Sequence, residues 1–247
     1  MQILQARDYN EMSELAAKRV IDQIKSSPQT TLGLATGATP LGIYQRLVED
    51  SRKNGTSYRQ VSTFNLDEYV GLSPEHPNSY RYYMDQNLFS GLDIDKARTH
   101  LPDGMAEDLE QECIQYEEKL KKAGGIDIQL LGLGRNGHIG FNEPGTPFSS
   151  RTHVVELDDS TRQANRRFFD SLDEVPTRAI TMGIASIMEA REILLLVSGD
   201  KKADILHRLL EEEVVESLPA SVLKRHPQVT LIAEEPLLSG HKRVTCP

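Results

Sequence analysis

The alternation of short apolar strands with helical segments most constrains the fold of this chain. Strand-like runs with apolar rather than alternating patterns occur at 31–35, 61–66, 126–131, 192–197 and 229–233. Strands of this kind, separated by helices, are typical of a parallel sheet that is buried on both faces. We therefore predict an α/β fold: a single doubly wound, mostly parallel, Rossmann-like sheet with helices on both faces, forming one domain over 1–247.

Several helices are signalled by their ends. Asp8 and Glu11 form a D-x-x-E capping pattern ahead of apolar residues at helical spacing, and Pro28 follows the end of this helix. Thr39 is expected as the N-cap of the next helix, with Pro40 at its first position. Further helices are expected at 80–88, 106–121, 161–169 and 200–212, and a further strand at 152–157.

Composition excludes several classes of partner and compartment. The net charge of −9 disfavours nucleic acid, whose backbone requires a basic face, and the sequence has no polybasic stretch for an anionic membrane. No run approaches the roughly 18 apolar residues of a membrane span, and the N-terminus does not resemble a signal peptide. Two cysteines, Cys113 and Cys246, are too few for a disulfide framework. These features predict a cytoplasmic protein.

Three segments at predicted strand ends have the composition of a ligand site, because ligands of such sheets bind beyond the carboxyl ends of the strands. The first segment, 33–40, reads GLATGATP. Small residues between a strand and a helix let backbone N–H groups approach an anion, and the hydroxyls of Thr36 and Thr39 can donate as well. The alternative is a tight turn with a threonine cap.

The second segment places Asp67 and Glu68 directly after a strand. A carboxylate at this position can act as a base above the sheet edge. Neighbouring residues of an extended chain point to opposite sides, so at most one of the two is expected to face a ligand. The alternative is a solvated loop or an Asx turn.

The third segment, 131–145, is rich in glycine and contains His138 and Glu143. Histidine is the side chain that ordinarily exchanges a proton near neutral pH, and a nearby carboxylate can hold one tautomer. A lone loop histidine is otherwise a solvated or capping residue. Arg167 and Lys202 are candidate cations for an anionic ligand, although either alone reads as a surface charge. The other histidines lack metal-ligand spacing, so no metal is predicted.

Taken together, these segments resemble the glucosamine-6-phosphate deaminase family. The resembling motifs are GLATGATPLGIY, STFNLDEYVGL with HPNSY after it, LGLGRNGHIGFNEPG, SRTHVVELDDSTRQANRRFF and LPASVLKRHP. They occur in the family's order and cover nearly the whole chain. The resemblance implies isomerisation and deamination of glucosamine 6-phosphate to fructose 6-phosphate and ammonia. It also implies that no cofactor is needed, because the reactive nitrogen belongs to the substrate.

The resemblance also implies roles for individual residues. Asp67 would be the proton-transfer base, and His138 would catalyse ring opening with support from Glu143 and Asn136. The residues that would bind the 6-phosphate are Thr36, Gly37, Ala38, Thr39, Arg167 and Lys202. The alternatives are a 6-phosphogluconolactonase-like hydrolase of the same fold and a non-catalytic sugar-phosphate sensor.

The sequence departs from the family at two places. Asn136 replaces an aspartate of some members, and an amide can orient His138 but cannot stabilise an imidazolium as a carboxylate would. Glu143 would then carry more of that role. Allosteric hexameric members use basic residues at positions that here carry His153 and Val155. This difference favours an unregulated monomer or small homo-oligomer.

Overall fold

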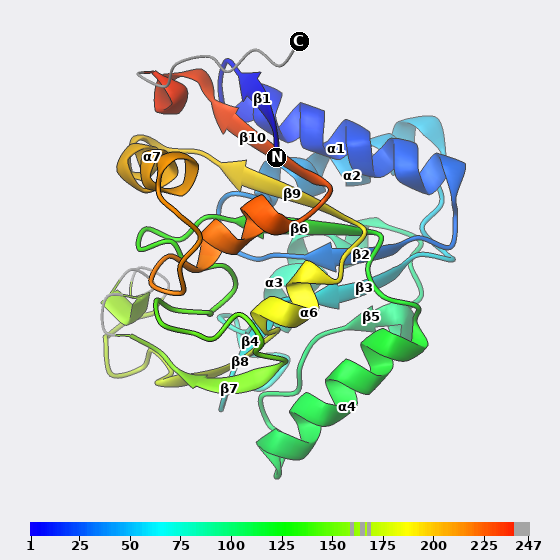
Figure 1. The fold of residues 1–247 in the computed structure, drawn as a ribbon. Helices are drawn as coiled ribbons and strands as arrows, with labels where there is room; N and C mark the ends of the chain where they lie inside the picture. Colours follow the sequence, from blue (N-terminus) through cyan, green and yellow to red (C-terminus); the bar gives the residue numbers. More distant parts are fainter. Residues whose placement is uncertain (159–160, 164–165, 167–168, 240–247) are drawn as a thin grey trace.

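A seven-stranded parallel sheet forms the centre of the computed structural model, which describes residues 1–158, 161–163, 166 and 169–239 (Figure 1). In spatial order the strands are β1 (Gln2–Ala6), β10 (Val229–Glu234), β9 (Glu192–Val197), β6 (Ile128–Gly132), β2 (Thr31–Leu34), β3 (Ser62–Asn65) and β5 (Thr99–His100). Every neighbouring pair in this sheet is parallel. The predicted α/β fold class is confirmed.

Helices cover both faces of the sheet (Figure 1). One face packs against α1 (Tyr9–Ser26), α2 (Leu41–Asn54) and α3 (Tyr80–Asn87). The other face packs against α4 (Leu109–Lys122), α6 (Ile184–Met188), α7 (Ala203–Glu211) and the 3-10 helix η5 (Pro219–Arg225). Besides η5, the described residues form four short 3-10 helices: η1 (Phe89–Gly91), η2 (Lys96–Arg98), η4 (Asp200–Lys202) and η6 (Glu235–Leu238).

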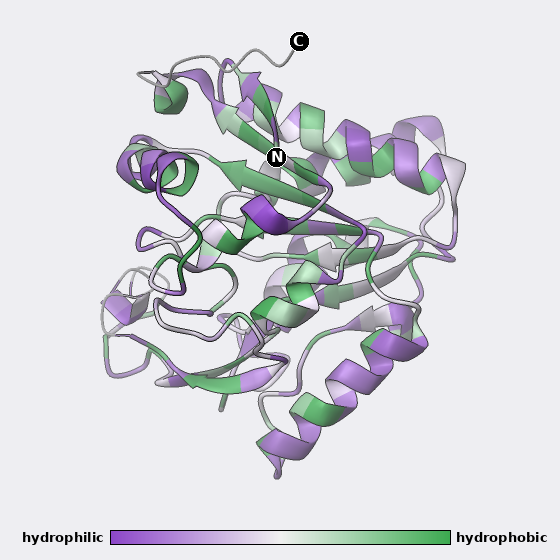
Figure 2. Ribbon diagram, in the orientation of Figure 1, coloured by the Kyte–Doolittle hydropathy of each residue, from purple (hydrophilic) through white to green (hydrophobic). Residues whose placement is uncertain are grey.

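The central strands are mostly apolar because both of their faces are buried. In β9, Leu194 and Leu196 pack under α1 and α2, whereas Ile193 and Leu195 pack on the opposite side of the sheet. Figure 2 shows β9 and β10 mostly in hydrophobic colours and the outer surfaces of α1 and α4 in hydrophilic ones. This burial supplies the largest favourable contribution to folding.

A second, three-stranded antiparallel sheet lies beside the large one, in the order β4 (Asp67–Tyr69), β8 (Arg178–Thr181) and β7 (His153–Glu156). Of these strands, only β7 was expected from the sequence. An extended chain was expected at Asp67 and Glu68 but not a separate strand, and these residues pair in register with β8, which excludes the alternative of a solvated loop. Three residues are too few to show an alternating pattern, so the pairing decides the conformation.

The start of α1 agrees with the sequence prediction, whereas the starts of α2 and α4 differ from it. Asp8 caps α1 and accepts a hydrogen bond from the Glu11 backbone N–H at 2.9 Å, as predicted. The N-cap of α2 is Pro40 rather than Thr39. α4 begins at Leu109 rather than near 106, because the Asp108 side chain caps it. The helix expected over 161–169 lies partly outside the described residues.

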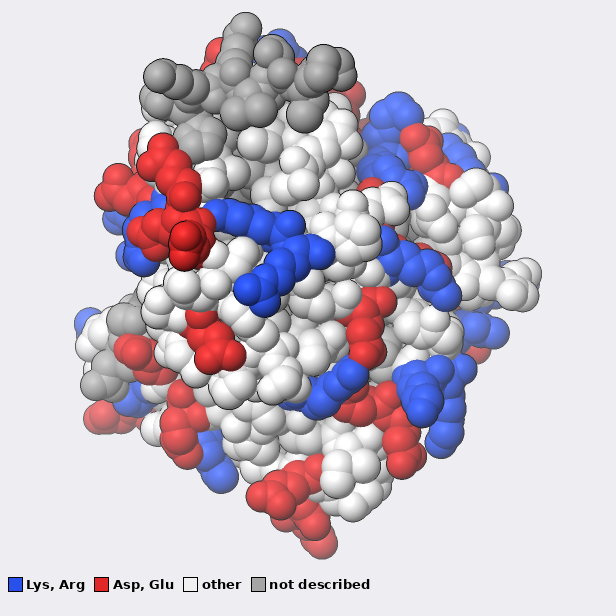
Figure 3. All heavy atoms as spheres, viewed as in Figure 1, with Lys and Arg blue, Asp and Glu red and all other residues white. Residues whose placement is uncertain are grey.

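The surface of the molecule mixes charges of both signs, with Lys and Arg interspersed among Asp and Glu on the face shown in Figure 3. Among the described helices, none combines the length and apolar character needed to cross a bilayer. Cys113 is a buried free thiol, and Cys246 lies outside the described residues.

Candidate active site

The parallel register brings the predicted ligand segments to one edge of the sheet. Leu34 of β2 lies beside Asn65 of β3, so the loop at 36–39 and the segment that begins at Asp67 both start just beyond the same level. On the other side of β2, β6 ends at Gly132, which lies beside Leu196 near the end of β9. The glycine-rich loop therefore begins at this edge too.

The loop at 36–39 is held from behind by tyrosine hydroxyls. One tyrosine comes from each of the helices α1, α2 and α3, and each hydroxyl donates a hydrogen bond to a carbonyl oxygen of the chain around this loop. The pairs are Tyr44 Oη with Ala35 O at 2.5 Å, Tyr83 Oη with Gly37 O at 2.6 Å and Tyr9 Oη with Ala38 O at 2.9 Å. These contacts fix the direction of the peptide groups.

The opposite side of these peptide groups is available to a ligand. Within the described part of the chain, no hydrogen bond uses the backbone N–H of Gly37, Ala38 or Thr39. Gly37 has φ of +91°, a conformation that favours glycine. Free N–H groups that precede the N-terminus of α2 suit an anion such as a phosphate.

The two predicted cations differ in what the structure describes. Lys202 Nζ donates a hydrogen bond to the carbonyl oxygen of Leu133, so its ammonium lies at the base of the glycine-rich loop. Arg167 lies outside the described residues.

Asp67 is the first residue of β4 and is only 7% exposed. Burial, and then the charge of the neighbouring Glu68, raise the pKa of the Asp67 carboxyl to about 8. Glu68 points elsewhere, because its carboxylate accepts hydrogen bonds from backbone N–H groups of α3. The two carboxylates thus have different surroundings, as the extended chain predicts.

The glycine-rich loop reaches Asp67 through Gly140. Gly140 has φ of +58°, and a side-chain carbon placed on it would lie 3.7 Å from Asp67 Oδ2 and 2.9 Å from Thr181 Oγ1. The Phe141 backbone N–H donates to Thr181 Oγ1 at 3.0 Å, and Thr181 lies opposite Asp67 in the small sheet. The absence of a side chain at 140 lets the loop pass close to Thr181, which lies opposite Asp67.

His138 stands on the same loop with its ring over Gly134. A side-chain carbon at Gly134 would lie 2.3 Å from the imidazole Cδ2, so only glycine leaves space for this ring. The side chain of His138 remains 24% exposed, and its Nδ1 lies 3.5 Å from Glu143 Oε2. The separation is that of an electrostatic contact and exceeds a normal hydrogen-bond length.

Asn136 acts on Glu143 rather than on the imidazole. Its Nδ2 donates to Glu143 Oε2 at 2.6 Å, while its Oδ1 accepts from the backbone N–H of His138 at 3.2 Å. The expectation that Asn136 orients the ring by direct contact is therefore refined, since its side chain holds the backbone of His138 and the carboxylate beside its ring.

Thr161 completes the surroundings of Glu143, and its role was not anticipated from the sequence. The buried hydroxyl of Thr161 donates to Glu143 Oε1 at 2.5 Å. Burial opposes ionisation of Glu143, but His138, Thr161 and Asn136 outweigh it and lower the pKa of this carboxyl to about 2. The two residues are 18 positions apart, and no spacing in the sequence links them.

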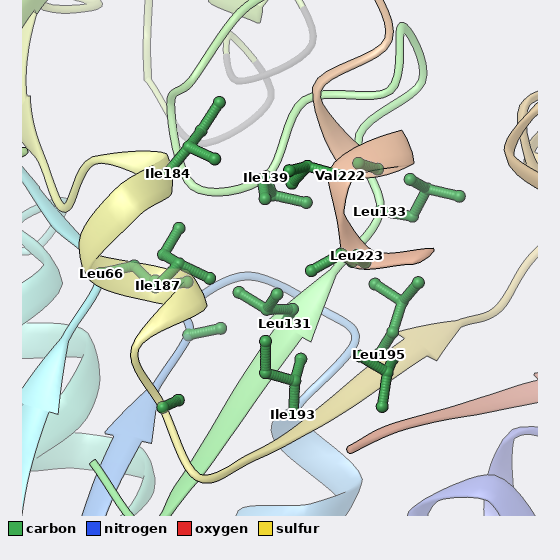
Figure 4. Packing of buried hydrophobic residues seen from close by; sticks show 14 of the residues in the cluster. Leu66, Leu131, Leu133, Ile139, Ile184, Ile187, Ile193, Leu195, Val222 and Leu223 are labelled. Atoms are coloured by element: carbon green, nitrogen blue, oxygen red, sulfur yellow. The ribbon is translucent and has the colours of Figure 1, made fainter. Parts of the chain in front are cut away.

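The loop that carries His138 is anchored in the hydrophobic core. Leu133 and Ile139 pack against Val222 and Leu223 of η5 (Figure 4). The backbone N–H of Ala220 also donates to the carbonyl oxygen of Gly137 at 2.9 Å. The C-terminal motif 218–227 therefore supports the loop that carries His138.

Positions 153 and 155, which carry basic residues in the allosteric members that the sequence resembles, lie on β7. His153 of β7 lies with its Nδ1 2.8 Å from the Arg151 carbonyl oxygen, and the Arg151 guanidinium contacts Glu117 and Glu189. Among the described residues, no group of three or more His, Cys, Asp or Glu side chains is placed to hold a metal ion.

Comparison with known proteins assigns the chain to a family. Residues 6–232 match the family described as glucosamine-6-phosphate isomerases/6-phosphogluconolactonase. The chain is 61% identical over 239 residues to a glucosamine-6-phosphate deaminase of Geobacillus sp. (strain WCH70), covering 97% of this chain and 95% of that protein. It is 52% identical to the deaminase of Bacillus velezensis over 97% of this chain and 100% of that protein.

Comparison with solved structures agrees with this family assignment. A monomeric glucosamine-6-phosphate deaminase superposes with a TM-score of 0.95 at 48% identity, covering 97% of this chain and 99% of that one. A 6-phosphogluconolactonase from Trypanosoma cruzi superposes with a TM-score of 0.78 at 20% identity, which shows a shared fold. The chain belongs to the glucosamine-6-phosphate isomerase/6-phosphogluconolactonase family.

Proposed function

We propose that this protein converts glucosamine 6-phosphate and water to fructose 6-phosphate and ammonia. The observation that carries the proposal is the position of Asp67, a buried carboxylate at the sheet edge between a loop with free N–H groups and the loop of His138. Relatives of 61% and 52% identity named glucosamine-6-phosphate deaminase support the same reaction.

His138 catalyses the first step, which is opening of the pyranose ring. The imidazole moves a proton from the C1 hydroxyl to the ring oxygen, so the C1 aldehyde forms as the ring C–O bond breaks. The anionic carboxylate of Glu143, 3.5 Å from Nδ1, favours the protonated ring during this transfer. Gly134, Asn136 and Thr161 hold the two groups in place.

Asp67 catalyses the second step, which moves a proton from C2 to C1. Its carboxylate takes the C2 proton, the adjacent aldehyde takes up the electron pair, and a proton from the substrate's ammonium group passes to the oxygen at C1, which gives an enolamine. Return of a proton to C1 gives a C2 imine, which water hydrolyses to the ketose and ammonia. Burial gives Asp67 a higher basicity than an exposed carboxylate, and this suits it to a weakly acidic carbon.

The phosphate supplies the orientation energy. We propose that it binds to the N–H groups and hydroxyls of the loop at 36–39, with Arg167 and Lys202 supplying positive charge. Binding at C6 holds C1 and C2 above Asp67 without taking part in the chemistry.

Ammonia release tests the proposal directly. Purified protein is supplied with glucosamine 6-phosphate, and both ammonia and fructose 6-phosphate are measured. We expect the two products in equal amounts. Absence of both products would reject the proposal, and opening of 6-phosphogluconolactone by the same protein would favour the hydrolase of the shared fold. Galactosamine 6-phosphate as a second substrate defines the selectivity at C4.

Replacement of Glu143 by glutamine is expected to lower kcat by about 10- to 100-fold, the range for losing a charged hydrogen-bond partner. The pKa of Glu143 is about 2, so its carboxylate is ionised throughout the working range and the loss should be present at every pH from 6 to 9. Thr161→Val, which removes one hydrogen bond and keeps the charge, should cost less. An unchanged kcat in the glutamine variant would remove Glu143 from the mechanism.

Replacement of Tyr83 by phenylalanine tests the support of the phosphate loop. The variant loses the hydroxyl that binds the Gly37 carbonyl oxygen, so KM is expected to rise about 2- to 10-fold while kcat stays the same. Tyr82→Phe, at an exposed position of the same helix, is the matched control. Equal KM values for the two variants would contradict the role of Tyr83.

We also propose that the protein works without an allosteric activator, as a monomer or small homo-oligomer. His153 and Val155 replace basic residues of the regulated members, and Arg151 contacts two glutamates. The structurally similar deaminase is described as monomeric. Initial rates with and without N-acetylglucosamine 6-phosphate, together with the mass in solution, provide the measurement.

A further inference from the structure

Glu68 is a buried carboxylate that the mechanism above does not use. It is only 4% exposed and adjoins Asp67 in the three-residue strand β4. Its Oε1 accepts hydrogen bonds from the backbone N–H groups of Tyr69 at 2.8 Å and Tyr80 at 2.9 Å, and its Oε2 accepts from the N–H of Arg81 at 2.9 Å. Two of these donors belong to the first turn of α3.

These contacts join β4 to the helix that also supports the phosphate loop. α3 begins at Tyr80, and one turn later Tyr83 donates its hydroxyl to the Gly37 carbonyl oxygen. Glu68 at one end and Tyr83 at the other thus connect the strand of Asp67 with the loop at 36–39 through a single turn of helix. A rigid connection of this kind fixes the separation between two parts of a site.

We propose that Glu68 is a positioning residue, which holds α3 and the phosphate loop at a fixed separation from Asp67 and whose negative charge strengthens Asp67 as a base. The proposal rests on the function proposed above and extends it to a residue that does not touch the substrate.

The charges around the pair support this role. The carboxylate of Glu68 is stabilised by three N–H groups and by the Arg81 guanidinium, although burial raises the pKa of Glu68 to about 7. The charge of Glu68 adds to the effect of burial and raises the pKa of the Asp67 carboxyl further. The other described titratable groups whose charge is coupled to Asp67 are Tyr44, Tyr69, Tyr80 and Tyr116.

Replacement of Glu68 by glutamine separates this role from simple support of the fold. The amide removes the charge and places its NH2 group against at least one backbone N–H, which breaks part of the contact with α3. We expect the pKa of Asp67 to fall by about 1 unit and the low-pH limb of kcat/KM to move down with it. We also expect the dissociation constant of inorganic phosphate to rise about 2- to 10-fold.

The pKa of Asp67 is measured in the ligand-free protein from its side-chain carboxyl 13C resonance, which is assigned by its loss in Asp67→Asn. Glu192→Gln is the matched control, because Glu192 is another buried carboxylate but begins β9 at the opposite end of the strands. It is expected to change neither value. Tyr83→Phe should weaken phosphate binding and leave the pKa of Asp67 unchanged.

A folded Glu68→Gln variant in which either the pKa of Asp67 or the affinity for phosphate equals that of the wild type would overturn the proposal. If the variant does not fold, the wild type supplies the test. Its Asp67 resonance should then titrate well above the ordinary range of an aspartate, and an ordinary midpoint would overturn the proposal. Neither the titration of Asp67 nor the affinity for phosphate requires turnover. Both therefore test the role of Glu68 even if no ammonia is released, a result that would reject the proposed function alone.

Discussion

An Asp67→Asn variant is expected to lose about 10²- to 10⁴-fold in kcat, the usual contribution of a positioned general base. Asparagine fills the same volume but has no lone pair of comparable basicity, so the C2 proton is not removed. Binding of inorganic phosphate should stay within about twofold, because the loop at 36–39 is held by tyrosines rather than by Asp67.

The same variant is expected to be more stable than the wild type at high pH. The pKa of Asp67 in the folded protein, about 8, lies above the ordinary value of 3.8, so the native state binds this proton more tightly than the unfolded state does. The stability of the wild type therefore falls as pH rises from the ordinary value of 3.8 to about 8 and levels off above it, and asparagine removes this loss. Melting temperatures from pH 6 to 9 should diverge in favour of the variant.

Asp127→Asn is the matched control, because Asp127 is a partly buried carboxylate at the amino ends of the strands, where it accepts from the Thr31 backbone N–H at 2.7 Å. This variant should lose stability and keep its kcat. Near-normal turnover by Asp67→Asn would exclude Asp67 as the base. A difference in melting temperature between Asp67→Asn and the wild type that does not change with pH would contradict the raised pKa of Asp67.

A His138→Gln variant is expected to show the second large loss, again about 10²- to 10⁴-fold in kcat. The two variants should differ in which step they stop. Ring opening and closing interconverts the anomers of glucosamine 6-phosphate, so Asp67→Asn should still speed anomer exchange while His138→Gln should not. Two-dimensional exchange NMR of the bound and free sugar measures this rate without requiring ammonia release.

His153→Gln serves as the control for His138, since His153 lies on β7 with its ring against the Arg151 carbonyl oxygen. It should keep both turnover and anomer exchange. If His138→Gln accelerated anomer exchange as the wild type does, ring opening would have to be assigned to another residue.

The sequence could predict the large sheet because burial on both faces leaves a continuous signal. β9 was anticipated residue for residue, and Asp8 was recognised as a cap because its geometry depends on only four neighbouring positions. The placement of Asp67, His138 and the loop at 36–39 at one edge follows from parallel register alone.

Contacts between distant short segments could not be predicted in this way. β4 and β8 contain three and four residues, too few to show a period, and their pairing is decided by tertiary packing. The hydroxyl of Thr161 and the carboxylate of Glu68 each meet their partners only after the chain has folded. Gly140 gave no signal beyond being one of several glycines, although its missing side chain lets the loop pass close to Thr181, which lies opposite Asp67.

The position of β1 at one border of the large sheet has a consequence for synthesis of the protein. Among the described strands, β1 pairs with β10 alone, with Gln2 beside Thr230. β1 therefore lacks this partner until β10 has been translated, which at 5–20 residues per second takes on the order of ten seconds or more. During that interval β1 is an unpaired strand open to chaperones, and its pairing with β10 is a late event of folding.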